Sequence, residues 1–205
     1  DKTTLSFKRY LYESFELSRL TALVGPRGVG KTTFMLQYIK EKLSKDHKVF
    51  YFSADSVYFR QSTLLAFIND LYNLEGYRIF FIDEIHQYAG WNQEIKNLYD
   101  AFPDIKILYS GSSMLELVKG SYDLSRRVKL YHLPGMSFRE YLNLSTHSNV
   151  QPIELSALLE TPQKFNNIGT IEAMMGAFKN YLANGYYPFV FEEPHSYYER
   201  VMRIL

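Results

Sequence analysis

The sequence predicts a three-layer α/β protein, in which helices cover both faces of a parallel β-sheet. Short apolar runs alternate with longer helical patterns through about residue 142. Two of these runs, RIFFID at 78–83 and KILYSG at 106–111, are almost continuously apolar, which is typical of strands buried on both faces of a parallel sheet. Strands and helices that alternate in series are joined by right-handed crossovers, and such connections lead to a layered architecture.

Five apolar runs are predicted to be strands, and the segments between them carry helical periodicity. The predicted strands are Leu20–Val24, Val49–Ser53, Arg78–Ile82, Lys106–Ser110 and Val128–His132. The predicted helices are Lys31–Ser44, Ser62–Asn73, Asn92–Ala101 and Ser113–Val118. A helical connection between two strands lets them run parallel to one another.

The character of the chain changes after LPGMSFREYLNL at 133–144. The residues from about 145 to 169 are polar and contain Pro152 and Pro162. The stretch TIEAMMGAFKNYLANG then predicts a helix that ends at Gly185 with a left-handed cap. We therefore expect one domain over 1–145 and a small helical region over 146–205.

Composition and charge exclude several classes of protein. With 46% hydrophobic and 22% charged residues the chain is globular. The net charge of +1 gives no support to a general attraction for nucleic acid or an anionic membrane. The chain has no cysteine, so disulfides, thiolate catalysis and cysteine-held zinc are excluded.

No apolar stretch approaches the length of a membrane span, and no signal-peptide pattern opens the chain. We therefore expect a cytoplasmic protein without a membrane association. The chain starts at Asp1 rather than at methionine and stops inside the helical pattern SYYERVMRIL. Because that helical pattern has no terminating cap, we expect a fragment of a longer protein.

A glycine-rich stretch, GPRGVGKTT, follows the first predicted strand and opens the first long helix. It fits the Walker A pattern G-x-x-x-x-G-K-[ST] in the strand–loop–helix context that the pattern requires. Backbone N–H groups and the helix N-terminus attract polyphosphate oxygens, the lysine reaches the outer phosphates, and the threonine hydroxyl can bind Mg²⁺. A glycine turn without a ligand is the alternative. The expected nucleotide-binding residues are Gly25, Pro26, Arg27, Gly28, Val29, Gly30, Lys31, Thr32 and Thr33.

Two adjacent acids, Asp83 and Glu84, follow the buried strand in RIFFIDEIH and form a Walker B pattern. They fall at the carboxyl edge of the predicted sheet, where ligands of α/β proteins bind. In nucleotide hydrolases the first acid holds Mg²⁺ and the second orients or polarises the attacking water. Acids at a strand end also serve as helix caps, which is the alternative here. We expect His86 to be a structural or loop residue.

Hydroxyl and arginine side chains supply two further candidates. Ser110 and Ser112 follow the strand in ILYSGSS, where a polar group can contact the terminal phosphate or the attacking water; simple turn chemistry is the alternative. Arg126 and Arg127 lie in DLSRRVKL. Arginine stabilises charge on a transferred phosphoryl group, in cis or from a neighbouring subunit, although a solvated charge cluster is the default interpretation.

Taken together, these motifs resemble the AAA-type ATPases of prokaryotes over roughly residues 5–145. The resemblance is carried, in order, by GPRGVGKTT, FFIDEIHQYAGWNQEIKNLYD, ILYSGSS, DLSRRV and LPGMSFREYL. It implies a P-loop NTPase fold of the additional-strand type, followed by a small helical lid region. In that fold the strand ending at Ser110 lies between the phosphate-loop strand and the Asp83 strand.

The resemblance also implies roles for individual residues. Lys31 and Thr32 match the phosphate-loop lysine and the magnesium ligand, whereas Asp83 and Glu84 match the metal-binding and water-polarising acids. Ser112 falls in a segment that senses the nucleotide.

Three further positions can be compared with the family. Arg127 matches an arginine that acts as a sensor or finger, whereas Arg126 stands where glycine is usual. Trp91 fits a packing position. The stretch YLANGYYPFVFEE is similar to the start of a winged-helix-like C-terminal region.

We expect an ATPase with catalytic residues Glu84, Lys31, Ser112 and Arg127, with Mg²⁺ held by Thr32 and Asp83. The alternative is a nucleotide-gated binding module with little intrinsic hydrolysis, regulated by DNA or a protein partner. A small-molecule kinase is disfavoured by the adjacent acids. A homo-oligomer would allow Arg127 to act between subunits. Phe7 and Tyr10 are candidates for stacking on adenine, and no guanine-specific Asn-Lys-x-Asp pattern is present.

Overall fold

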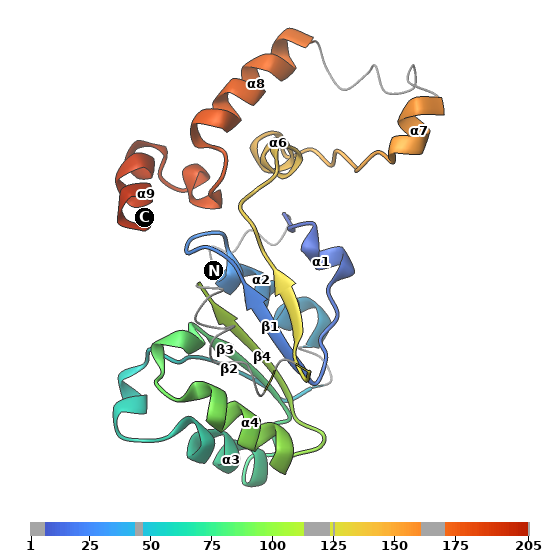
Figure 1. The fold of residues 1–205 in the computed structure, drawn as a ribbon. Coiled ribbons are helices and arrows are strands. Elements are labelled where there is room, and N and C mark those ends of the chain that lie inside the picture. Colours follow the sequence, from blue (N-terminus) through green and yellow to red (C-terminus); the bar gives the residue numbers. More distant parts are fainter. Residues whose placement is uncertain (1–6, 44–46, 113–123, 125, 161–170, 205) are drawn as a thin grey trace. The chain divides into compact units, whose positions relative to one another are not determined.

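The computed structural model describes residues 7–43, 47–112, 124, 126–160 and 171–204 (Figure 1). Its contacts divide the chain into two compact units, which comprise residues 1–134 and 135–205. The first unit contains the sheet and the phosphate loop. The second unit is helical, and each unit is described by itself.

The first unit is built on a five-stranded parallel sheet in the order β2-β3-β4-β1-β5. The strands are β1 (Leu20–Val24), β2 (Val49–Ser53), β3 (Ile79–Asp83), β4 (Lys106–Gly111) and β5 (Lys129–His132). This confirms the predicted parallel α/β sheet, with strand ends within one residue of the predicted ones. The strand that ends near Ser110 lies between β1 and β3, as the family resemblance implied.

Three helices lie where helices were predicted, namely α2 (Lys31–Tyr38), α3 (Leu64–Asn73) and α4 (Trp91–Ala101). A short helix that was not predicted, α1 (Leu11–Ser14), precedes β1. The α2 helix continues as a π-helical turn, η1 (Ile39–Leu43), and two 3₁₀ turns, η2 (Val57–Arg60) and η3 (Ile85–Gln87), complete the described helical segments of this unit. The helix predicted over Ser113–Val118 lies outside the described residues.

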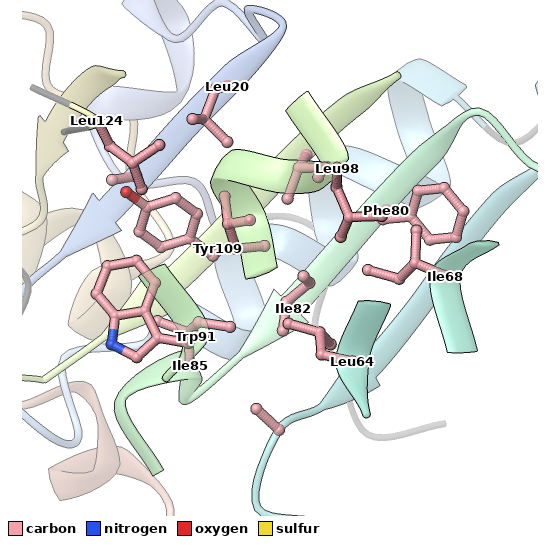
Figure 2. Packing of buried hydrophobic residues seen from close by; sticks show 14 of the residues in the cluster. Leu20, Leu64, Ile68, Phe80, Ile82, Ile85, Trp91, Leu98, Tyr109 and Leu124 are labelled. Carbon is pink, nitrogen blue, oxygen red and sulfur yellow. The ribbon is translucent and has the colours of Figure 1, made fainter. Parts of the chain in front are cut away.

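The two faces of the sheet carry separate sets of helices, because side chains alternate along each strand. On one face, Phe80 and Ile82 of β3 and Tyr109 of β4 pack with Ile68 of α3 and Leu98 of α4 in one buried cluster (Figure 2). The opposite face is covered by α1 and α2 (Figure 1), where the Tyr38 ring lies 6.3 Å from the ring of Phe81. The sheet is therefore the middle layer of three.

Trp91 has the packing role that we expected. Its side chain is buried in the cluster on the α3–α4 face, with its ring centroid 5.3 Å from that of Tyr109 (Figure 2).

The second unit consists of four α-helices and two 3₁₀ turns among its described residues. They are α6 (Phe138–Thr146), α7 (Leu155–Glu160), α8 (Ile171–Asn184), η5 (Pro188–Phe191), η6 (Pro194–Ser196) and α9 (Tyr197–Ile204). Ser137 and Glu140 begin α6 with a reciprocal capping box. Because the Phe138 ring packs 5.1 Å from Phe178 of α8, α6 groups with this unit. The division thus falls after Pro134, before the expected boundary near residue 145.

The predicted left-handed cap at Gly185 is wrong, because Gly185 does not have a positive φ angle. Its N–H donates to the Tyr181 carbonyl at 2.6 Å. A Cβ atom at this position would lie 2.1 Å from Cδ2 and 2.7 Å from the carbonyl oxygen of Tyr181. Glycine is therefore required by the close approach of Tyr181 and not by a left-handed backbone.

Two glycines of the same segment provide a matched test of this steric explanation. Gly176 lies inside α8 with open space around its Cα, so Gly176→Ala should stabilise the chain by about 0.5–1 kcal/mol. In contrast, Gly185→Ala should destabilise it by about 1–3 kcal/mol, since an overpacked site must shift. Equilibrium unfolding in denaturant measures both values, and shifts of the same sign would contradict the explanation.

Candidate nucleotide-binding site

The loop Gly25–Thr33 joins the carboxyl end of β1 to the first turn of α2. Gly28 and Gly30 have φ angles of 84° and 96°, which side chains other than glycine rarely adopt. The Gly30 carbonyl accepts from the Phe34 N–H at 2.9 Å, so the helix starts directly after the turn. This backbone leaves the N-terminus of an eight-residue helix at the end of a buried strand, which is a favourable place for a phosphate group.

The outer side of the loop is anchored by a buried arginine. The guanidinium of Arg9 donates to the carbonyl of Val29 at 2.8 Å and to that of Pro134 at 2.7 Å. A Cβ atom on Gly25 would lie 2.1 Å from the Leu133 carbonyl oxygen, so glycine is needed for this close approach. The loop is therefore held against the segment that follows β5. Sequence reasoning missed Arg9, since no local pattern separates it from the exposed Lys8 beside it.

Lys31 lies inside the loop with only 5% of its surface exposed. Its ammonium group donates to the carbonyl oxygens of Gly25 at 2.9 Å and of Pro26 at 3.0 Å. Burial lowers the pKa of Lys31, and the carboxylates of Glu84 and Asp83 act against this lowering. The loop thus holds one desolvated cation where the outer phosphates of a nucleotide are expected.

Asp83 is the polar centre of the site and is 4% exposed. Its Oδ2 accepts from the Thr32 hydroxyl at 2.5 Å and from the Tyr51 hydroxyl at 3.0 Å. Its Oδ1 accepts from the Ser110 hydroxyl and, at 3.1 Å, from the backbone N–H of Glu84. The carboxylate therefore accepts hydrogen bonds from α2, from the two strands next to β3 and from the backbone of the following residue.

Tyr51 is a site residue that the sequence analysis did not identify. It pairs with Phe81 across β2 and β3, and Phe81 points to the same face of the sheet as Asp83, two residues later. Burial and the neighbouring Asp83 carboxylate raise the pKa of Tyr51 well above its usual value, so its hydroxyl stays protonated as a donor. In the sequence, a tyrosine within an apolar strand cannot be distinguished from a core residue, so no sequence signal indicates that Tyr51 belongs to the site.

Glu84 differs from Asp83 in its surroundings. Its backbone is left-handed, with φ 51°, and its N–H also contacts the Ser110 hydroxyl oxygen at 3.1 Å. Its side chain is 29% exposed, with Oε2 3.5 Å from Nδ1 of His86. Strained backbone of this kind is common at functional sites.

The predicted sensing serines take different positions. Ser110 is fully buried against Asp83, whereas Ser112 lies one residue beyond β4 with its Oγ 3.2 Å from Nε2 of His86. Phe7 accepts through its carbonyl from Gln37 at 2.9 Å, and adenine stacking by Phe7 or Tyr10 stays a prediction.

Arg127 is not brought to the phosphate loop of its own chain. It precedes β5, which runs parallel to β1, so it lies at the amino edge of the sheet, opposite the loop. There its guanidinium pairs with Asp100 of α4 at 3.4 Å and lies 5.7 Å from the ring centroid of Tyr99. Arg126 is exposed at the same edge.

The polar groups next to the loop fit a magnesium ion bound together with phosphate. Thr32 and Asp83 offer one hydroxyl and one carboxylate oxygen, and Mg²⁺ takes few protein ligands beside water and phosphate oxygens. In the part of the chain that the structure describes, no group of three or more His, Cys, Asp and Glu side chains could form an all-protein metal site. None of the described helices has the length and apolar character required to cross a bilayer.

Two of the solved structures that this chain resembles are distant in sequence. AMPPCP-bound DnaA from Aquifex aeolicus is 17% identical, with a TM-score of 0.47, over 94% of this chain and 62% of that chain. The Hsp104–ADP complex of S. cerevisiae is 15% identical, with a TM-score of 0.48, over 66% of this chain and 22% of that chain. The chain thus spans less than two thirds of either protein, and TM-scores below 0.5 add nothing to the strand order described above.

The comparison of sequences is more decisive. No curated protein matches the chain, but the family model described as "AAA domain" matches residues 17–142. The matched segment covers more than half of the 205 residues and contains β1 to β5, the phosphate loop and both acids. Because this match covers more than half of the chain, the chain belongs to the AAA domain family of P-loop nucleotide-binding ATPase modules.

Proposed function

We propose that this chain binds ATP with Mg²⁺ and hydrolyses the terminal phosphoanhydride. The proposal rests on one observation above all, the 2.5 Å contact between the Thr32 hydroxyl and the Asp83 carboxylate. That contact joins the start of the helix behind the phosphate loop to the strand that carries both acids. The contact supports the proposal because a hydroxyl and a carboxylate oxygen of this kind can bind the Mg²⁺ of a magnesium nucleotide.

In the proposed complex, backbone N–H groups of Gly25–Thr33 hold the polyphosphate. Lys31 exchanges its two carbonyl acceptors for phosphate oxygens, which costs little because the ammonium group is already desolvated. Thr32 and Asp83 hold Mg²⁺, which, when bound, offsets the negative charge of the phosphates.

The two acids are suited to different roles. Asp83 accepts four hydrogen bonds, which hold its carboxylate in one position, as suits a metal ligand. Glu84 accepts no hydrogen bond at its carboxylate from the described residues and is partly exposed. We therefore assign the metal to Asp83 and the orientation of the attacking water to Glu84.

A second candidate function is a nucleotide-gated module with little hydrolysis of its own. Arg9 favours it, because the same guanidinium binds Val29 of the loop and Pro134, the last residue of the first unit. A nucleotide that shifts the Val29 carbonyl would thereby act on the segment leading out of this unit. Turnover by the isolated chain would distinguish the two candidates.

The position of Arg127 supports an assembly of several chains. Since it lies at the edge of the sheet opposite the loop, Arg127 is unable to act on its own nucleotide and would act on that of a neighbouring copy. We therefore propose a homo-oligomer in which Arg127 supplies the positive charge that stabilises phosphoryl transfer in the next subunit.

Removing the buried cation tests nucleotide binding. Lys31→Met should weaken ATP binding at least about 100-fold, because charge-assisted bonds to phosphate are lost. The thermal midpoint should stay within about 5 °C of wild type, since a desolvated charge is also removed. Titration calorimetry with magnesium-ATP measures the affinity. Lys106→Met, at the exposed start of β4, is the control, and unchanged binding by Lys31→Met would contradict the site.

Neutralising the second acid tests hydrolysis. Glu84→Gln should slow ATP turnover about 100-fold or more, because the amide is unable to polarise water. ATP affinity should change less than about twofold, since the phosphate loop is untouched. Phosphate release and calorimetry provide the two readouts, with the exposed Glu75→Gln as control. Normal turnover by Glu84→Gln would remove Glu84 from the mechanism.

Protein concentration tests the role of Arg127. Activity per chain should rise with concentration, because each site is completed by a neighbour. Arg127→Ala should abolish that rise and lower the plateau at least about tenfold, whereas Arg126→Ala should retain both. A specific activity that does not depend on concentration would count against the shared site.

A further inference from the structure

His86 lies between the second acid and the end of β4. In the short η3 turn, its Nδ1 is 3.5 Å from Oε2 of Glu84 and its Nε2 is 3.2 Å from Oγ of Ser112. The side chain is only 10% exposed. One ring therefore contacts the proposed water-orienting acid on one side and the proposed nucleotide-sensing serine on the other.

The surroundings of the ring select one tautomer. The side-chain amide nitrogen of Gln87 lies 3.0 Å from Nε2 of His86, and an amide nitrogen is only a donor. Nε2 therefore accepts, both from Gln87 and from the Ser112 hydroxyl. In the neutral ring the hydrogen is then carried by Nδ1, which faces the Glu84 carboxylate.

The distance between Nδ1 of His86 and the Glu84 carboxylate can be shortened by a small side-chain movement. Nδ1 is buried and makes no hydrogen bond within the described part of the chain, because 3.5 Å is longer than such a bond. The Glu84 backbone is fixed by its N–H contacts with Asp83 and Ser110, so the gap would be closed by a small movement of the two side chains, either a rotation of the Glu84 side chain or a tilt of the His86 ring. A buried donor with an unsatisfied bond favours that movement.

Glu84 also acts on the phosphate loop from this position. Its carboxylate opposes the lowering of the Lys31 pKa more strongly than Asp83 does. In the orientation that faces His86, the Glu84 carboxylate thus also interacts favourably with the ammonium group of Lys31. An imidazole that holds Glu84 there keeps it next to the expected terminal phosphate.

We propose that His86 is a positioning residue that orients Glu84 for hydrolysis and links this orientation to Ser112. When the Ser112 hydroxyl turns toward a terminal phosphate oxygen, Nε2 loses one of its donors, and the ring is free to tilt Nδ1–H onto the Glu84 carboxylate. The presence of that phosphate is thereby coupled to the position of the acid. This inference rests on the proposed ATPase function.

Three variants of His86 separate its two contacts. His86→Ala removes both and should lower kcat about tenfold or more, with KM and ATP affinity within about twofold, because only the orientation of the acid is lost. His86→Asn keeps an amide donor near the place of Nδ1 and should recover most of kcat. His86→Gln keeps a polar group near the place of Nε2 and should not. The exposed His195→Ala, in the second unit, is the control.

A double-variant comparison tests the link to Ser112. Ser112→Ala should lower kcat clearly in the wild-type background and much less in His86→Ala, because residues that act through one another are not additive. Thermal unfolding of every variant shows whether the fold is kept.

Three outcomes would overturn the inference. They are an unchanged kcat in His86→Ala, equal losses of kcat and ATP affinity without recovery in His86→Asn, and additive effects of His86 and Ser112. Wild-type turnover is measured first, so that the two proposals can fail separately. A wild-type chain that hydrolyses no ATP overturns the proposed function together with this inference. Wild-type hydrolysis with any of the three outcomes overturns the inference alone.

Discussion

The buried carboxylate of Asp83 is the constraint on which the site depends. An ionised carboxylate out of water is stable only when its oxygens are hydrogen-bonded. Here the donors come from four places, namely Thr32 of α2, Tyr51 of β2, Ser110 of β4 and the backbone of Glu84. Each donor is positioned by a different element, so the carboxylate is satisfied only when α2 and three strands are in register. The polar centre and the packing of the sheet are thus determined together.

The same arrangement gives two neighbouring acids different surroundings. Asp83 ends a buried strand and accepts four hydrogen bonds, whereas Glu84 has a left-handed backbone and a partly exposed carboxylate near His86. In the proposed mechanism the fixed carboxylate of Asp83 holds the metal, and the more adjustable carboxylate of Glu84 orients the water. The left-handed backbone at Glu84 gives the two adjacent acids these different surroundings.

The phosphate loop is held from two sides. Asp83 fixes its helical end through Thr32, and Arg9 fixes its outer side through the Val29 carbonyl. Between them, Lys31 is kept desolvated with two backbone carbonyls as temporary acceptors. Because the ammonium group of Lys31 is already desolvated, binding a phosphate group removes little further water from it. Such a preorganised cation is well suited to stabilise the negative charge of a phosphate group.

The sequence alone determined the features that depend on local pattern. Apolar runs located every strand to within one residue, and the glycine spacing before Lys31 identified the loop, since both follow from short-range backbone and burial preferences. Only the tertiary structure revealed Tyr51 and Arg9, because their partners lie 32 and 20 residues away, and a strand tyrosine or a lone arginine carries no signal of its own. The parallel strand order likewise places Arg127 at the edge of the sheet opposite the loop. The close approach of Tyr181 explains Gly185, which the sequence pattern had assigned to a left-handed cap. Strand pairing and packing between distant residues determine these features, and a local sequence pattern contains no information about either.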